Sequence, residues 1–169
     1  MLKKFALHSA LAGALTAFAA AAAAHVTLET TEARVGSYYK AVLRVPHGCA
    51  GSPTVKLRVR IPEGVIAVKP QPKPGWTLST VHGDYQSTYT LHGATLRTGV
   101  REVAWSGGPL PDDQFDEFAF MAYLADDLPV GKPLHLPAVQ ECEEGVERWI
   151  DREADSSTPA PALMLLPGT

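Results

Sequence analysis

The stretch VKLRVRI, residues 55–61, alternates apolar and basic side chains. In an extended chain its four apolar residues lie on one face and its three basic residues on the other. Such a pair of faces is typical of a strand that covers a protein core and turns its other side to solvent. A helical spacing of apolar residues is hard to find elsewhere in the chain. The stretch therefore indicates a β protein.

Further short runs of strand-forming residues surround this stretch, and turns rich in glycine and proline separate them. We expect the other strands at residues 25–29, 38–45, 65–68, 76–81, 87–91, 100–105, 114–124, 134–139 and 146–151. Turn signals include residues 82–84 and 107–109. This organisation predicts an all-β fold, a single antiparallel β-sandwich of the immunoglobulin or cupredoxin-like kind over residues 25–153. Residues 154–169 are expected to form a loosely ordered C-terminal tail.

The first 24 residues have the composition of a targeting segment. Lys3 and Lys4 precede an apolar run over residues 5–18, and three small residues end the block at Ala24. This is the pattern of a secretory signal peptide, cut between Ala24 and His25. An uncleaved membrane anchor stays open as an alternative, because the apolar run is almost long enough to span a bilayer. A cleaved peptide predicts a periplasmic or secreted protein.

Size and charge exclude several classes of protein for the remaining chain. Residues 1–24 carry two lysines and no acidic residue, so 13 basic residues remain against 18 acidic ones. An acidic balance argues against a nucleic-acid partner, which favours a basic surface. No run of 18 apolar residues follows residue 25, so no later membrane span is expected. About 145 residues suffice for one domain with its own core.

Cys49 and Cys142 are the only two cysteines. In an oxidising compartment an even pair predicts a disulfide, which here closes a loop of roughly 90 residues. A metal site is the alternative, but neither cysteine has a C-x-x-C or C-x-x-x-H spacing. The disulfide also removes a cysteine nucleophile, and the chain lacks G-x-S-x-G and a glycine-rich phosphate loop. The protein is therefore not expected to be an enzyme.

Cleavage after Ala24 would make His25 the first residue of the mature chain. The α-amine and the imidazole Nδ1 of such a histidine can close a six-membered chelate ring on one metal ion. Two nitrogen donors at right angles suit the tetragonal preference of Cu(II). Because the amine titrates near pH 8, metal binding should weaken in acid. Histidine can also occupy this position by chance, so the residue alone leaves the function open.

A chelate of this kind needs further donors, and Glu117 is the best carboxylate on internal grounds. It lies among mostly apolar neighbours in the strand expected at residues 114–124. A carboxylate in such surroundings requires a compensating cation, which can be a metal ion or simply an arginine. Four other histidines follow His25, and each is expected at a turn or on the surface: His47, His82, His92 and His135.

Together these motifs resemble the YcnI-like copper-binding domain family of exported bacterial proteins. The resemblance is carried by AHVTLE (24–29), GSYY (36–39), RVP (44–46), IPEGV (61–65), KPGW (73–76), VAW (103–105), LPDD (110–113), FDEF (115–118) and VERW (146–149). It implies a β-sandwich in which the mature N-terminal histidine, here His25, holds Cu(II). An acidic side chain and a tryptophan complete such a site. The matching residues are Glu117, with Asp116 as its nearest competitor, and Trp149.

The leading hypothesis is thus an exported, non-catalytic copper-binding protein of copper trafficking or homeostasis. Its expected partners are the copper ion and another copper-handling protein. Two alternatives stay open: a metal-free β-sandwich that binds another protein, and a copper-dependent monooxygenase. Monooxygenases of this kind typically need a second histidine, for which the sequence offers no candidate with supporting context.

Overall fold

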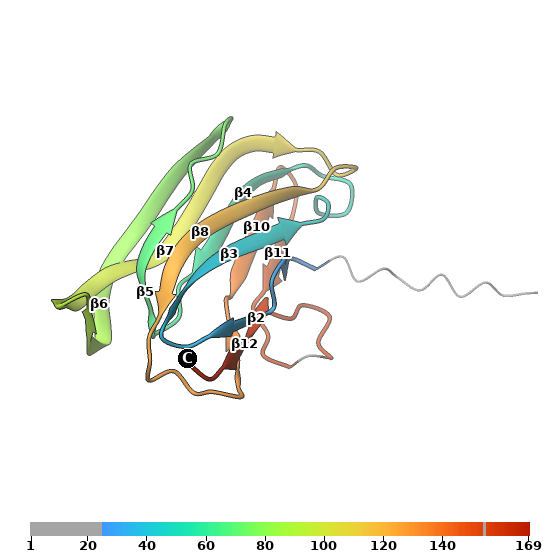
Figure 1. Ribbon diagram of the computed structural model, residues 1–169. Coiled ribbons are helices and arrows are strands. Elements are labelled where there is room, and N and C mark those ends of the chain that lie inside the picture. Colours follow the sequence, from blue (N-terminus) through green and yellow to red (C-terminus); the bar gives the residue numbers. More distant parts are fainter. Residues whose placement is uncertain (1–24, 154) are drawn as a thin grey trace, which may run out of the picture.

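The computed structural model describes residues 25–153 and 155–169, which form strands and turns but no helix (Figure 1). The predicted signal peptide, and Ala24 at its cleavage site, lie outside the described residues. The strands are β1 (Thr27–Leu28), β2 (Glu32–Arg34), β3 (Ser37–Val45), β4 (Thr54–Arg60), β5 (Val65–Pro70), β6 (Trp76–Leu91), β7 (Ala94–Leu110), β8 (Asp116–Leu124), β9 (Pro133–His135), β10 (Ala138–Cys142), β11 (Val146–Trp149) and β12 (Ala162–Leu166). No helix in this part of the chain is long and apolar enough to cross a membrane.

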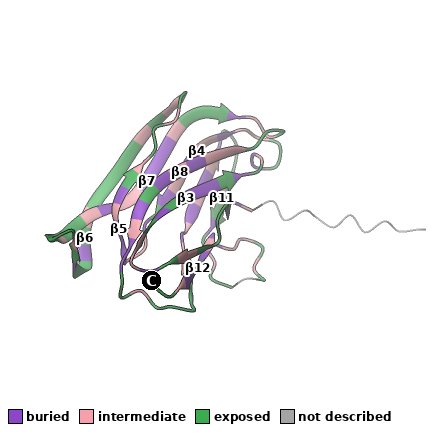
Figure 2. Ribbon diagram, viewed as in Figure 1, coloured by how far each residue is buried: buried purple, intermediate pink, exposed green. Residues whose placement is uncertain are grey.

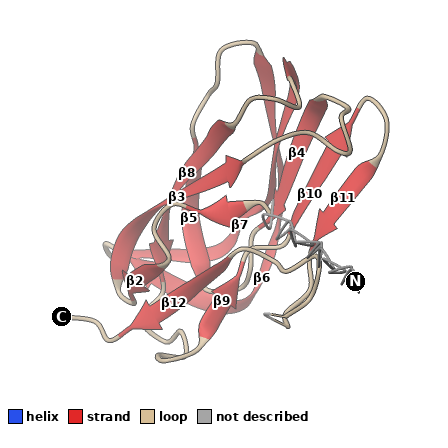
Figure 3. Ribbon diagram, turned by 90° about the vertical axis from the view of Figure 1, so that its right-hand side faces the viewer, coloured by secondary structure: helices blue, strands red, loops and turns tan. Residues whose placement is uncertain are grey.

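Two sheets form the layers of a sandwich, as the sequence predicts. The first has the order β1-β3-β8-β5, and the second has the order β11-β10-β4-β7-β6. Figure 3 shows β3 and β8 on one side and β4, β10 and β11 on the other. Neighbouring strands within both layers are antiparallel. The all-β prediction and the single antiparallel sandwich are therefore confirmed.

The core lies between the two layers, where the buried residues gather (Figure 2). Residues 55–60 lie in β4, and Ile61 follows the strand. Leu57, Val59 and Ile61 are fully buried. In β8 the row of Phe118 and Phe120 faces them, as its period-2 alternation predicts. Each such side chain contributes roughly 1.5–3 kcal/mol through removal of apolar surface from water.

Two of the expected turns are wrong, because the chain continues as strand through both. β6 runs through residues 82–84 with register shifts between Val81/His82 and Asp84/Tyr89. The chain reverses instead at His92 and Gly93, which both have positive φ and link Leu91 to Ala94. A two-residue turn of this kind matches the twist of a hairpin. The result is a long β6–β7 arm that projects from the sandwich (Figure 1).

The second wrong turn is at residues 107–109, which lie within β7. The two glycines there adopt φ values of 125° and 83°, which most side chains avoid. The strand bends at this point and still pairs with β6 at Trp76 and with β4 at Thr54. Glycines that signal a turn in the sequence therefore mark an irregularity of a continuous strand.

The predicted loosely ordered tail is also wrong, because its second half forms β12. This strand pairs in parallel with β2 and antiparallel with β9 in a third, three-stranded sheet. Leu163 and Leu165 are buried in the core, whereas Met164 between them is exposed. The period-2 pattern of residues 162–166 thus outweighs the prolines on either side, which lie outside the strand.

The predicted disulfide is confirmed: Cys49 and Cys142 are joined, with their Cα atoms 6.0 Å apart. It links the turn before β4 to the end of β10 in the second sheet. Both cysteines are buried, so the disulfide lies inside the protein.

Candidate metal centre

β1 and β11 are the edge strands of the two facing sheets, and the candidate centre lies where they meet. His25 stands two residues before the start of β1, and Trp149 ends β11. Their ring centroids are 5.3 Å apart, with the planes tilted by 50°. The two residues that the resemblance assigns from opposite ends of the domain are therefore in contact across the edge of the sandwich.

Trp149 is held by a buried network of neutral polar groups. Its indole Nε1 donates a hydrogen bond of 3.1 Å to Oε1 of Gln140 on β10. The amide nitrogen of Gln140 donates in turn to the carbonyl oxygen of His47 and to Thr54 Oγ1, each at 2.7 Å. Thr54 Oγ1 lies 3.8 Å from Cys142 Sγ. The tryptophan is thus connected to the disulfide and to the loop before it.

Glu117, the carboxylate that the resemblance assigns, has an arginine as its partner. Glu117 lies on the outer face of β8, where Arg44 Nε donates a hydrogen bond of 2.8 Å to its carboxylate. Arg44 also pairs with Glu29 at 3.0 Å, so one guanidinium of β3 contacts both β8 and the residue that follows β1. The cation beside Glu117 is therefore an arginine, which the sequence left open. The competing carboxylate Asp116 pairs with Lys73 at 2.6 Å.

Glu147 is a carboxylate that sequence reasoning missed. It stands two residues before Trp149 in β11, and alternate residues of a strand share a face. The burial pattern agrees, because Val146 and Arg148 are exposed whereas Glu147 is half-buried. Its partner in register on β10 is Gln140, the anchor of Trp149. The alternation within VERW is the signal that would have found it.

His47 and His92 have side-chain contacts other than with His25. His47 contributes its carbonyl to the Gln140 network, while its ring contacts Gly48 O and lies 3.9 Å from Asp112. His92 contacts Tyr38 at the turn of the β6–β7 arm. Among the described residues, no group of three or more His, Cys, Asp or Glu side chains is arranged to hold a metal ion.

The side chains at this edge carry donor atoms of the type that Cu(II) binds, but they are too few for a complete site. One imidazole and one carboxylate are nitrogen and oxygen ligands of the type that Cu(II) prefers. A tetragonal site requires about four donors, so two side chains leave it incomplete. A free α-amine on His25 would add a third donor without any change in the fold. A copper site at this edge would therefore require a chain that begins at His25.

Comparison with known proteins extends these observations. The model of a domain family described as "Domain of unknown function (DUF1775)" matches residues 25–165. The copper-binding protein CutI of Bacillus subtilis (strain 168) is 33% identical over 164 aligned residues, which cover 94% of this chain and 72% of the relative.

A solved structure confirms the fold class. An uncharacterized protein from Nocardia farcinica, described as having an immunoglobulin-like fold, superposes with a TM-score of 0.61 and 25% sequence identity. The superposition covers 84% of this chain and 98% of the other. The immunoglobulin-like sandwich expected from the sequence is therefore shared with an independently solved protein.

Proposed function

The chain belongs to the DUF1775 family, to which the YcnI-like proteins belong, and on that premise we propose that it is an exported copper-binding protein. It holds Cu(II) through His25 once the bond from Ala24 to His25 is cut. The observation that carries the proposal is the 5.3 Å contact between His25 and Trp149 at the edge of the sandwich. The name of the Bacillus relative, a copper-binding protein, supports the same metal.

His25 supplies two nitrogen donors in this proposal, the α-amine and the imidazole Nδ1. Glu147 supplies the carboxylate, because it shares a strand face with Trp149 and has no ion pair with another described residue. Glu117, the carboxylate assigned from the resemblance, is already compensated by Arg44. Trp149 covers the imidazole and limits access of water.

The protein acts outside the cytoplasm, in the periplasm or as a secreted protein, and exchanges copper with another copper-handling protein. Its role is binding and not catalysis. Support for a binding role comes from the donor set, which offers one histidine side chain, and from the relative's name. Copper trafficking or homeostasis is the process that such a protein serves.

The decisive experiment compares Cu(II) titrations of two preparations of the domain. One begins at His25, and the other carries one extra alanine before it. The first should bind one Cu(II) with an EPR spectrum of nitrogen and oxygen ligands. The second has an amide in place of the amine, so its affinity should fall by at least tenfold. Equal affinities and identical spectra would disprove the chelate.

Two matched substitutions then identify the carboxylate. Glu147→Gln should change the Cu(II) EPR spectrum of the domain that begins at His25, and Glu117→Gln should leave it unchanged. The reverse result would return the assignment to Glu117. Unchanged spectra in both variants would remove a carboxylate from the site while leaving the histidine chelate intact.

A further inference from the structure

Gln140 accepts a hydrogen bond from the indole of Trp149, whose ring contacts His25. We propose that Gln140 is a positioning residue of the copper centre, acting through the indole of Trp149. This inference rests on the proposed function. It adds a residue that lies outside the ligand set and that no motif in the sequence singles out.

The orientation of the Gln140 amide follows from its partners. An indole N–H can only donate a hydrogen bond, and a backbone carbonyl can only accept one. Trp149 Nε1 therefore requires the amide oxygen at 3.1 Å, and the carbonyl of His47 requires the amide nitrogen at 2.7 Å. The second amide hydrogen is directed to Thr54 Oγ1. Both amide hydrogens are used, so the side chain has one arrangement.

Because the network is buried, loss of any of these hydrogen bonds is costly. Gln140 is 1% exposed and Thr54 is fully buried, so water does not replace a lost hydrogen bond easily. A buried polar group without a partner costs roughly 1–3 kcal/mol. An indole ring that turned away from Gln140 would leave its own N–H and the amide oxygen unpaired. The network therefore resists rotation of Trp149 and keeps its ring against His25.

Few residues can replace glutamine here. Methionine has a similar volume but neither donates nor accepts strongly, so three polar groups would lose a partner. An ionised glutamate would set an oxygen against the carbonyl of His47, which repels it. Only an amide donates on one side and accepts on the other at this length. The requirement is chemical and not one of shape alone.

The first test uses the metal-free domain. In ¹H–¹⁵N NMR spectra the indole Hε1 of Trp149 should shift in Gln140→Met, since it loses its acceptor. Gln114→Met is the matched control, because Gln114 is exposed, and it should leave that resonance in place. Should Gln140→Met fail to fold, Thr54→Val tests the same amide with a smaller loss of hydrogen bonds. An indole resonance unchanged in the folded variant would overturn the proposal.

The second test separates positioning from stability by a double-mutant cycle. With Cu(II) as the probe, Gln140→Met should weaken binding by about tenfold and alter the EPR spectrum at saturation, as supporting groups around metal ligands do. In a Trp149→Phe background the same substitution should have no further effect on the spectrum. Additive effects in the two backgrounds, or an unchanged spectrum of Gln140→Met, would overturn the proposal. Failure of the unsubstituted domain to bind Cu(II) would instead overturn the proposed function.

Discussion

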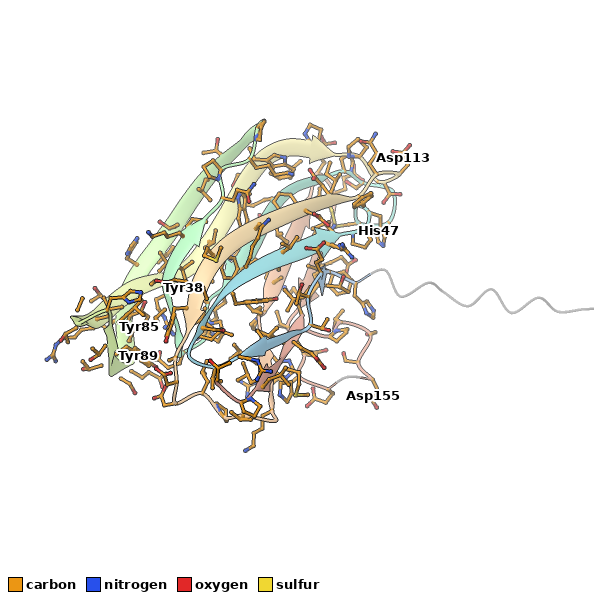
Figure 4. The ribbon with its side chains drawn as sticks, viewed as in Figure 1. Tyr38, His47, Tyr85, Tyr89, Asp113 and Asp155 are labelled. Carbon is orange, nitrogen blue, oxygen red and sulfur yellow. A yellow bond between two sulfur atoms is a disulfide. The ribbon has the colours of Figure 1, made fainter. Side chains whose placement is uncertain are left out.

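Two polar networks, one buried and one partly buried, lie at opposite sides of the molecule, and they are built from different chemistry. Gln140, Thr54, Trp149 and the His47 carbonyl form a neutral network beside the candidate copper centre. Glu63 and Arg101 form a charged network where the β6–β7 arm joins the sandwich. Figure 4 shows His47 far from Tyr85 and Tyr89, which mark the two sites.

The charged network is centred on the carboxylate of Glu63. Tyr89 Oη donates to it at 2.7 Å, and the backbone amides of Gln86 and Ser87 donate at 3.0 and 3.3 Å. Arg101 Nη1 lies 3.1 Å from the other oxygen. Burial raises the pKa of the Glu63 carboxyl, but these hydrogen bonds and the charge of Arg101 outweigh burial and lower it overall.

The two networks differ in whether their groups can gain or lose a proton. The charged network contains groups that titrate, and burial with the Glu63 contact raises the pKa of Tyr89 to about 12. The neutral network contains an amide, a hydroxyl, an indole and a carbonyl, which do not titrate in water. Trp149 is therefore held equally at any pH, and changes in copper binding with pH should come from the ligands themselves.

The largest expected loss of stability follows from removal of the disulfide, which lies beside the neutral network. Cys49→Ser with Cys142→Ser should lower the free energy of unfolding by about 4 kcal/mol, because the bond closes a loop of 93 residues in the unfolded chain. Urea unfolding measures this loss. A thiol reductant should destabilise the natural domain to the same degree and leave the variant unaffected. A loss below about 1 kcal/mol would contradict the expectation.

Glu63→Gln should have the next largest effect, about 2 kcal/mol at pH 7, because Arg101 loses its counter-charge in a partly buried site. Glu102→Gln provides the control. Glu102 lies 3.6 Å from Arg58, which also pairs with Glu141 at 2.8 Å and so keeps a counter-charge, and its loss should cost less than about 1 kcal/mol. Equal losses in both variants would show that the charged network adds nothing beyond a surface pair.

A third measurement follows the same variant through acid. Because the pKa of Glu63 is lowered in the folded state, the unfolded chain binds more protons near pH 4 than the folded protein does. The stabilisation by Glu63 is fully present above its ordinary pKa of about 4.3 and is lost as the pH falls through the folded value. The stability difference between the natural domain and Glu63→Gln should shrink over that range. The corresponding difference for Gln140→Met should stay constant.

Thr54→Val should have the smallest effect, about 1 kcal/mol, since it removes one acceptor of the Gln140 amide and keeps the shape of the side chain. Thermal unfolding of the metal-free domain at pH 5 and pH 8 measures it. The loss should be equal at the two pH values. A loss that differs between them would mean that the neutral network couples to a titrating group after all.

The fold was predictable because its information is local. Alternation in β8 and from Leu57 to Ile61 specifies which side chains face the core, and both patterns are confirmed. The alternation fails at Val55, which is half-buried next to a register shift of β4, while Thr54 is buried in its place. β12 escaped prediction because Pro161 and Pro167, on either side of its alternating leucines, are typical of irregular chain. The arm escaped it because His82–Asp84 carries turn residues that a sheet edge accommodates as irregular strand.

The candidate site was predictable only in part, for a different reason. His25 and Trp149 came from motifs, and their contact depends on how two sheet edges meet. The ion pair between Arg44 and Glu117 depends on strand register across β3 and β8, which no run of residues reveals. Glu147 and Gln140 likewise become neighbours only through the register of β10 and β11.

The parallel pairing of β2 with β12 constrains the order in which the strands of the protein can pair. Arg34 donates a hydrogen bond of 2.9 Å to the carbonyl oxygen of Pro167, across a separation of 133 residues. A ribosome synthesises β2 long before β12, because 133 residues separate Arg34 from Pro167. β2, which follows His25 by only a few residues, must therefore wait for nearly the whole chain before its sheet can close.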